Sequence, residues 1–163
     1  MTDIYEFLTQ HNIPFERHDH PPVYTVEEAD RLVPPLSAAK TKNLFLRDKK
    51  GKRHFLVVVP GDKQVDLKGL TKAIGTDKIS FGSPERLKKH LGIEPGSVSM
   101  LAVANDAEQA VELFIDKALW ADDAFQCHPL VNTATLVVPK TGIEAFFSAT
   151  GHEAHLIEVP ARN

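Results

Sequence analysis

The chain is poor in cysteine and has no long apolar segment. Cys127 is the single cysteine among 163 residues, so no internal disulfide can form, which fits a reducing compartment. No apolar run approaches the ~18 residues that a membrane-spanning helix needs. Residues 1–6 lack the basic start and apolar stretch of a signal peptide. The sequence therefore predicts a cytoplasmic protein that makes no membrane contact.

The chain also lacks a strong net charge. Its formal charge of -3 argues against a protein that coats duplex DNA by charge alone, so we expect no DNA partner. Recognition of a few phosphates at one end of an RNA stays compatible with this balance. A length of 163 residues predicts a single domain over residues 1–163, large enough to bury a core without disulfides or metals.

Several catalytic and cofactor motifs are missing. There is no Gly-x4-Gly-Lys-Ser/Thr phosphate loop, no dinucleotide fingerprint and no Gly-x-Ser-x-Gly elbow. His18 and His20 would share one face of a strand while Asp19 points the other way, and surface histidines are favoured over a metal site. Cys127 and His128 are adjacent and would point apart, which disfavours a catalytic cysteine. We expect neither a cofactor nor a metal.

The expected elements do not alternate regularly. Pro14–His20 is expected to be extended, and residues 122–133 show little periodicity. A Thr25–Glu28 capping box predicts a short helix that stops before Pro34. Asn105 or Asp106 is a candidate cap for one more turn. The remaining predicted helices cover residues 2–11, 66–74, 83–91 and 141–150, and the last of these has a Thr141–Glu144 capping box. The predicted strands cover residues 44–46, 55–59, 79–81, 111–115, 135–138 and 155–159. This order predicts an α+β fold, a single domain with a mixed, largely antiparallel sheet and flanking helices.

The most informative segment is the run from Lys40 to Leu46. Lys42 and Asn43 stand at the start of a strand that pairs, across a Gly51 turn, with a second apolar run in a β-hairpin. A lysine there can lay its stem on the sheet and its ammonium in a cleft, which suits an anionic or ester-bearing substrate. The alternative is an ordinary solvated strand end.

Two further segments are more specialised than packing requires. Gly92–Ser99 holds a proline and two glycines, and such a loop lets backbone N–H groups approach a ligand closely. Cys127–Thr133 places the His128 imidazole and the Asn132 carboxamide in a proline-restrained loop. A plain turn and an ordinary polar loop are the alternatives for these two segments.

In chain order, these segments resemble the YbaK/ProX-type aminoacyl-tRNA editing family. The resemblance rests on an ordered set that runs over nearly the whole chain, because no single piece is specific. The family is similar in fold to the editing domain inserted in bacterial prolyl-tRNA synthetases, and its members hydrolyse the ester of wrongly charged tRNA. The matching segments are residues 42–46 with 48–51, 66–68, 95–99, 105–106, 115–116, 128–129 with 132–133, and 151–152.

Within this family, the Lys-Asn-Leu-Phe-Leu sequence at 42–46 resembles the free-standing Ala-tRNA(Pro) deacylases. The resemblance implies a trans-editing hydrolase that deacylates mischarged Ala-tRNA(Pro) at its 3'-terminal adenosine. The implied partners are the acceptor end of mischarged tRNA and, transiently, prolyl-tRNA synthetase. Two alternatives stay open: a Cys- or Ser-tRNA deacylase of the same family, and a non-catalytic module that binds tRNA or the synthetase.

The resemblance also implies roles for single residues. Lys42 is implied as the key lysine, Gly96 as part of the loop whose backbone holds the ester carbonyl, and His128 as the catalytic-loop histidine. An aminoacyl ester is already activated, so placement and oxyanion stabilisation matter more than a strong nucleophile. Either a side chain or the 2'-hydroxyl of the adenosine can activate water. The implied substrate-binding residues are Asn43, Ser97, Val98, Asn132 and Tyr24.

A basic strip follows the same hairpin. It consists of Lys40, Lys42, Lys49, Lys50, Lys52 and Arg53. On a chain that is acidic overall, this strip is interpreted as the face that RNA approaches, with a solvated hairpin tip as the alternative.

Overall fold

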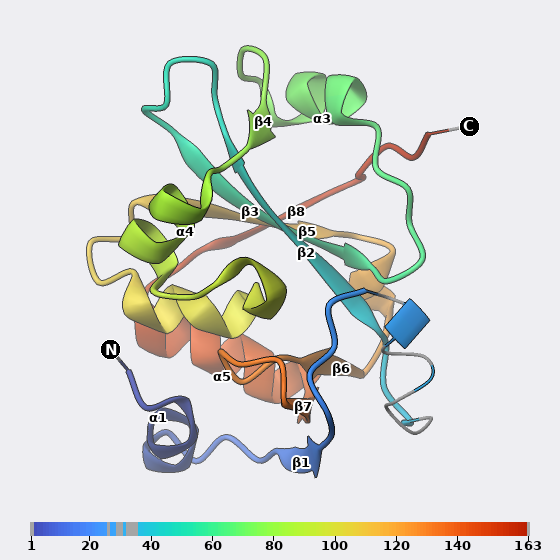
Figure 1. Ribbon diagram of the computed structural model, residues 1–163, viewed down its shortest axis with the longest axis vertical. Coiled ribbons are helices and arrows are strands. Elements are labelled where there is room, and N and C mark those ends of the chain that lie inside the picture. Colours follow the sequence, from blue (N-terminus) through green and yellow to red (C-terminus); the bar gives the residue numbers. More distant parts are fainter. Residues whose placement is uncertain (1, 26, 29–30, 32–35, 163) are drawn as a thin grey trace.

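The computed structural model describes residues 2–25, 27–28, 31 and 36–162 (Figure 1). The predicted short helix after Thr25 falls largely on positions outside the described residues. Within them, Thr25 Oγ1 accepts a hydrogen bond from the Glu28 N–H at 3.0 Å, which is the contact that a capping box requires.

Two sheets form the framework, and the α+β class predicted from the sequence is confirmed. The five-stranded sheet has the order β4-β2-β3-β5-β8 and is mixed: β2 pairs antiparallel with β3 and β4, whereas β5 pairs parallel with β3 and β8. The three-stranded sheet, β1-β7-β6, is antiparallel. The strands are β1 (Glu16–Asp19), β2 (Thr41–Arg47), β3 (His54–Pro60), β4 (Ser80–Phe81), β5 (Val111–Asp116), β6 (Ala124–Cys127), β7 (Ala134–Pro139) and β8 (Ala154–Ile157).

Most helix ends follow from local sequence. Asp3, Asp66 and Ser83 each accept a backbone N–H at a helix start, as N-cap residues do. Gly75 and Gly92 end their helices in the left-handed conformation that favours glycine. The α-helices are α1 (Ile4–Gln10), α3 (Leu67–Ile74), α4 (Pro84–Leu91) and α5 (Lys140–Thr150), and the 3₁₀ helices are η1 (Pro95–Ser97), η2 (Met100–Asn105) and η3 (Leu119–Ala121).

Two local predictions were wrong, and a third holds for one of its two candidates. Helix α5 begins one residue early, after Pro139, with no side-chain cap, so the Thr141–Glu144 capping box does not form. Asn105 is the last residue of η2, whereas Asp106 caps the turn that follows: its carbonyl accepts from the Gln109 N–H and its Oδ1 from the Ala110 N–H, both at 3.0 Å. The segment expected to be irregular contains β6, whose pairing with β7 depends on tertiary contacts that local periodicity does not reveal.

The core fills both faces of the five-stranded sheet. Strand β3 is buried along nearly its whole length. Leu56 and Val58 pack in the larger apolar cluster with α5 and the three-stranded sheet, while Val57 and Val59 pack in a smaller cluster with α3. Figure 1 shows α3 and α5 on opposite sides of this sheet. Within the described ranges, no helix has the length and apolarity to cross a membrane.

Candidate active site

Lys42 lies near the start of β2 and is anchored by backbone. Its Nζ donates to the carbonyl of Lys63 at 2.6 Å, and its side chain is partly buried. Lys63 is itself fixed, because its Nζ lies 2.5 Å from Asp116 Oδ2 and 2.8 Å from the Val159 carbonyl. An ammonium has three donors, so the contact with Lys63 leaves Lys42 able to donate to a ligand while held in place.

Asn43, the next residue, carries a buried oxygen with no hydrogen-bond partner. This atom, Oδ1, is one of three such side-chain atoms among the described residues. Strand β2 is held here against the second sheet, because Thr41 Oγ1 donates to the Gln126 carbonyl at 2.6 Å. A buried acceptor without a donor is costly, so this site suits a ligand or water that supplies one.

His128 follows β6 and presents a similar unpaired atom. Its Nδ1 is buried and has no partner among the described residues. Burial, with a smaller contribution from His20, lowers the pKa of His128, although a hydrogen bond with the Ala134 backbone acts in the opposite direction. The ring is therefore neutral at pH 7 and can accept at one nitrogen and donate at the other.

Gly96 lies where two other predicted residues meet. A Cβ built on Gly96 would be 3.2 Å from Tyr24 Cδ1 and 3.4 Å from Asn132 Nδ2. The Asn132 side chain donates to the Val23 carbonyl at 3.1 Å, and the Val23 N–H donates to the Asn132 carbonyl at 3.3 Å. Tyr24 stays 72% exposed, so an aromatic face stands beside a glycine backbone and is open to a planar group such as a base.

Ser97 and Val98 face inward more than the sequence suggested. Ser97 is buried, and its N–H donates to the Glu94 carbonyl at 2.9 Å inside η1. Val98 packs partly buried against the larger cluster. These two residues shape the loop, and Gly96 is the position where its backbone lies beside exposed side chains.

The predicted residues fall into two groups. Tyr24, Gly96 and Asn132 are in mutual reach. Lys42 and Asn43 lie on the strand start that is bonded to β6, and His128 comes directly after that strand. Lys63 and Asp116 support Lys42 and were not singled out as site residues. An acidic residue directly after a buried strand was the available signal for Asp116.

The remaining titratable candidates behave differently. Burial raises the pKa of Cys127 to about 12, so its thiol stays protonated, as expected for a structural cysteine. His20 is partly buried, and its Nε2 lies 2.9 Å from Thr135 Oγ1. His18 is also partly buried, with an unpaired Nε2. Within the described part of the chain, no group of three His, Cys, Asp or Glu could hold a metal ion.

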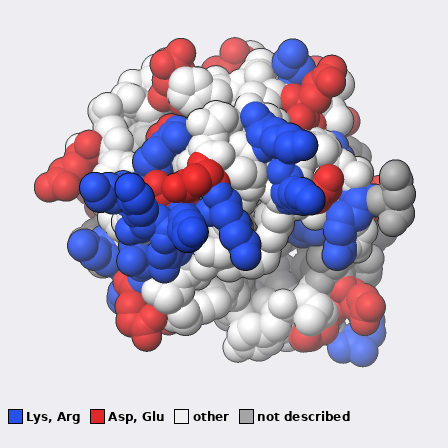
Figure 2. Space-filling view, turned by 90° about the horizontal axis from the view of Figure 1, so that it is seen from above, with Lys and Arg blue, Asp and Glu red and all other residues white. Residues whose placement is uncertain are grey.

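The basic strip is exposed along most of its length. Lys49, Lys50 and Lys52 are exposed, whereas Arg53 is engaged by Glu112 through two 2.8 Å contacts. Figure 2 views the molecule from the end that carries the β2–β3 turn and shows Lys and Arg side chains gathered there. Arg53 therefore contributes less than its neighbours to this face.

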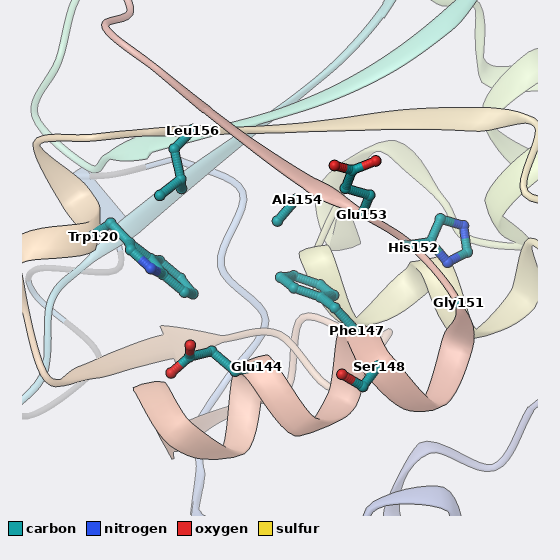
Figure 3. Close-up of a pocket in the computed structure, with 9 residues that line it drawn as sticks. All are labelled: Trp120, Glu144, Phe147, Ser148, Gly151, His152, Glu153, Ala154 and Leu156. Carbon is teal, nitrogen blue, oxygen red and sulfur yellow. The ribbon is translucent and has the colours of Figure 1, made fainter.

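A separate hollow of about 400 Å³ lies between α5 and β8. Figure 3 shows Phe147 from α5 and Trp120 facing it, with Ala154 and Leu156 on the β8 side. None of its lining residues is a predicted site residue, although Gly151 and His152 belong to a segment that carries the family resemblance. The hollow is therefore distinct from the groups around Lys42 and Gly96.

The comparisons with known proteins identify the family of this chain. The aminoacyl-tRNA editing domain matches residues 20–146, which span the segments from Tyr24 to His128 and Asn132. This chain belongs to the aminoacyl-tRNA editing domain family.

Individual relatives support the assignment. The chain is 39% identical over 152 residues to a prolyl-tRNA editing protein, ProX, of Acetoanaerobium sticklandii, covering 93% of each. It is 35% identical to the prolyl-tRNA synthetase associated domain-containing protein 1 of Danio rerio, covering 92% of this chain and 82% of that protein. In fold, it is similar to the hypothetical protein APE2540, with a TM-score of 0.73 and 20% identity over 96% of this chain and 99% of the other.

Proposed function

We propose that this editing-domain protein is a trans-acting deacylase of mischarged Ala-tRNA(Pro), working as a single editing domain over residues 1–163 in the cytoplasm. Its substrate is the aminoacyl ester at the 3'-terminal adenosine. Family membership and the likeness to ProX support an editing role. The observation that carries the proposal is the pair of buried, unpaired polar atoms, Asn43 Oδ1 and His128 Nδ1, at positions singled out from the sequence.

Lys42 acts as a fixed cation in this proposal. Its ammonium, held by the Lys63 carbonyl, has further donors for a phosphate oxygen or the ester region. A positioned charge at a partly water-excluded site stabilises developing negative charge better than the same charge in water. Lys42 therefore binds and stabilises, and it does not attack.

His128 and Gly96 complete the catalytic set. The neutral His128 ring accepts a hydrogen bond at Nδ1 from a water or from the 2'-hydroxyl and so orients it. The Gly96 backbone approaches the ester carbonyl. Asn43 Oδ1 accepts a donor such as the aminoacyl ammonium, while Ser97 and Val98 shape the loop wall.

The exposed ring of Tyr24, beside Asn132, provides a platform for the terminal adenosine, since base stacking on aromatic side chains is worth about 1–3 kcal/mol. A pocket sized for alanine excludes the larger proline. Each methylene contributes only about 1–3 kcal/mol to such discrimination, so esters of other small amino acids are hydrolysed more slowly but measurably. Prolyl-tRNA synthetase is a transient partner, because it supplies the mischarged tRNA.

The test is deacylation of Ala-, Cys-, Ser- and Pro-tRNA(Pro) and of Ala-tRNA(Ala). We expect fast loss of Ala-tRNA(Pro), abolished by Lys42→Ala and retained by Lys72→Ala, a control lysine on α3. Full activity of Lys42→Ala would remove the assigned role of that residue. Faster hydrolysis of the cysteinyl or seryl ester would assign the enzyme to that amino acid in place of alanine. Stoichiometric binding without turnover would favour a non-catalytic binding module.

A further inference from the structure

A second hollow, of about 500 Å³, lies between the β2–β3 turn and α4. It is apart from the predicted active site, at the opposite end of the hairpin from Lys42. Its lining is dominated by basic and imidazole side chains. The residues that matter here are Lys52, His54, Glu85, Arg86, Lys89 and His90.

The lysines and the arginine of this hollow form no ion pair among the described residues. Glu85, although it lines the hollow, pairs with none of Lys52, Arg86 and Lys89. The contrast with Lys88 is informative, because this neighbour of Lys89 pairs with Glu94 at 3.3 Å. Three unpaired cations around one concave surface attract an anion.

Arg86 is held in place without being neutralised. Its Nη1 donates to the Gly51 carbonyl at 3.2 Å and to His54 Nε2 at 3.0 Å. A Cβ on Gly51 would stand 2.7 Å from Arg86 Nη2, so the absence of a side chain at Gly51 lets the guanidinium lie against the turn. A guanidinium presents five donors, and this one keeps several for a ligand in a fixed orientation.

The two histidines extend the site without adding charge. Their ring centroids are 4.1 Å apart. Burial, with the neighbouring His90 and Arg86, lowers the pKa of His54 to about 4, and burial also lowers the pKa of His90. His54 is therefore neutral at pH 7, with Nε2 accepting from Arg86, and His90 is available as a neutral hydrogen-bond donor.

The position of the hollow selects an extended ligand. In the β2–β3 register, His54 is opposite Arg47 and Val59 is opposite Lys42. These two positions are five residues apart along each strand, a distance of about 17 Å. The exposed Lys49 and Lys50 directly precede Gly51 and Lys52, which line the hollow, and so extend its basic surface along the same turn. A free amino acid ester cannot reach both ends of the hairpin, whereas a nucleic-acid strand can.

We propose that this hollow is a phosphate-binding subsite for the RNA backbone, which holds the acceptor arm while its 3' end lies near Lys42. This inference rests on the proposed function for the nature of the polyanion. Phosphate contacts position a nucleic acid without reading its sequence. The subsite therefore sets affinity and register, and amino-acid selection belongs to the other end of the hairpin.

The test compares two double variants whose net charge changes by the same amount. Lys52→Gln/Lys89→Gln removes two cations of the hollow, and Lys72→Gln/Lys88→Gln removes one lysine of α3 and the Glu94-paired lysine of α4. Arg86 is left intact because it also supports the turn. Binding of an unacylated acceptor-stem hairpin RNA is measured by fluorescence anisotropy over a series of salt concentrations.

For the hollow variant we expect Kd to rise about tenfold at low salt and the salt slope to fall by about two, one for each phosphate that a lysine no longer neutralises. The control keeps the parent slope. Equal slopes for the two double variants, or an unchanged Kd in the hollow variant, would overturn the proposal.

A second readout separates this inference from the proposed function. Hydrolysis of a minimal substrate, the alanyl ester of adenosine, is measured with the same variants. We expect the hollow variant to hydrolyse it at the parent rate while its KM for full-length Ala-tRNA rises. If the salt slope falls in the hollow variant but the parent protein deacylates nothing, the phosphate subsite is supported and the proposed deacylase function is wrong. A tenfold rate decrease on the minimal ester would instead place these lysines at the active site and contradict the subsite.

Discussion

Lys63 Nζ lies 2.5 Å from Asp116 Oδ2, and the carbonyl of the same lysine receives the ammonium of Lys42 at 2.6 Å. The Asp116 side chain is almost completely buried, and its other oxygen accepts from the Ala118 N–H at 3.2 Å. A buried ion pair thus fixes a backbone carbonyl, and that carbonyl orients the proposed catalytic lysine.

Removing one member of this pair is expected to be more harmful than removing both. Lys63→Met leaves the Asp116 charge buried and unpaired, which costs about 3–5 kcal/mol of folding stability. The double variant Lys63→Met/Asp116→Leu recovers most of this stability, since an apolar pair can replace a buried ion pair. Urea unfolding of the parent, both single variants and the double variant measures the coupling.

Deacylation by the same double variant tests whether the pair positions Lys42. We expect its kcat to stay at least tenfold below the parent although its stability is restored, because the Lys63 carbonyl is no longer fixed. Parent-like kcat in the double variant would mean that the pair acts only in folding.

Gly96→Ala and Gly75→Ala are expected to have opposite effects. The new methyl at Gly96 meets the Tyr24 ring at 3.2 Å, so we expect a stable protein with a raised KM for Ala-tRNA. Gly75 has φ +82° and no heavy atom near its added Cβ, so alanine there costs about 1–2 kcal/mol and leaves KM unchanged. Thermal unfolding and steady-state kinetics on both variants provide the comparison. A Gly96→Ala protein with the parent KM would argue against backbone contact at this loop.

His128 is expected to govern activity on the acidic side of neutrality. Burial lowers its pKa, so the neutral ring that accepts through Nδ1 persists below pH 6.5 and is lost only as the pH falls through the lowered pKa. We expect His128→Gln to reduce kcat by a factor that stays constant down through pH 6.5 and shrinks only as the pH falls through the lowered pKa of the ring. Parallel pH–rate profiles over the whole range would show that His128 only lines the site.

Asp106 is expected to make stability depend on pH. Burial raises its pKa, but hydrogen bonds from His152, Val111 and Ala110 outweigh this effect and hold the pKa below its ordinary value. The unfolded chain then binds a proton more readily than the folded one. This stability is fully present above about pH 4 and is lost as the pH falls through the folded pKa. Urea unfolding at pH 7, 5 and 3 measures this contribution to the free energy of unfolding. The Asp106→Asn variant should be about 1.5–3 kcal/mol less stable than the parent at pH 7, and its stability should depend less on pH.

Local signals in the sequence were sufficient for much of the fold. The β2–β3 hairpin and the helices that begin after Asp66 and Ser83 were predicted from turn and cap residues, which act over a few positions. Strand β6 was missed because its pairing with β7 and its contact with Thr41 are tertiary. The Thr141–Glu144 box did not form because α5 begins one residue earlier, at Lys140, and Pro139 at the N-cap position has no side-chain oxygen with which to cap it.

The sequence proposes the residues of the candidate site but says little about their contacts. Sequence motifs identified Lys42, Gly96 and His128, and the structure adds what those motifs do not encode. The anchoring of Lys42 by Lys63 and Asp116 joins three separate segments, so no local pattern reports it. The engagement of the Ser97 N–H within η1 likewise depends on the detailed turn geometry.

The parallel pairing of β5 with β3 has a consequence for the growing chain. Strands β2 and β3 are neighbours in sequence and can pair as soon as they leave the ribosome, whereas Asp116 is supplied by a later strand across a long crossover. The nascent chain therefore carries a basic hairpin well before the carboxylate that fixes Lys63 exists. Such an intermediate can attract RNA but cannot yet align its lysine, so the growing protein should gain nucleic-acid affinity earlier in its synthesis than hydrolytic competence.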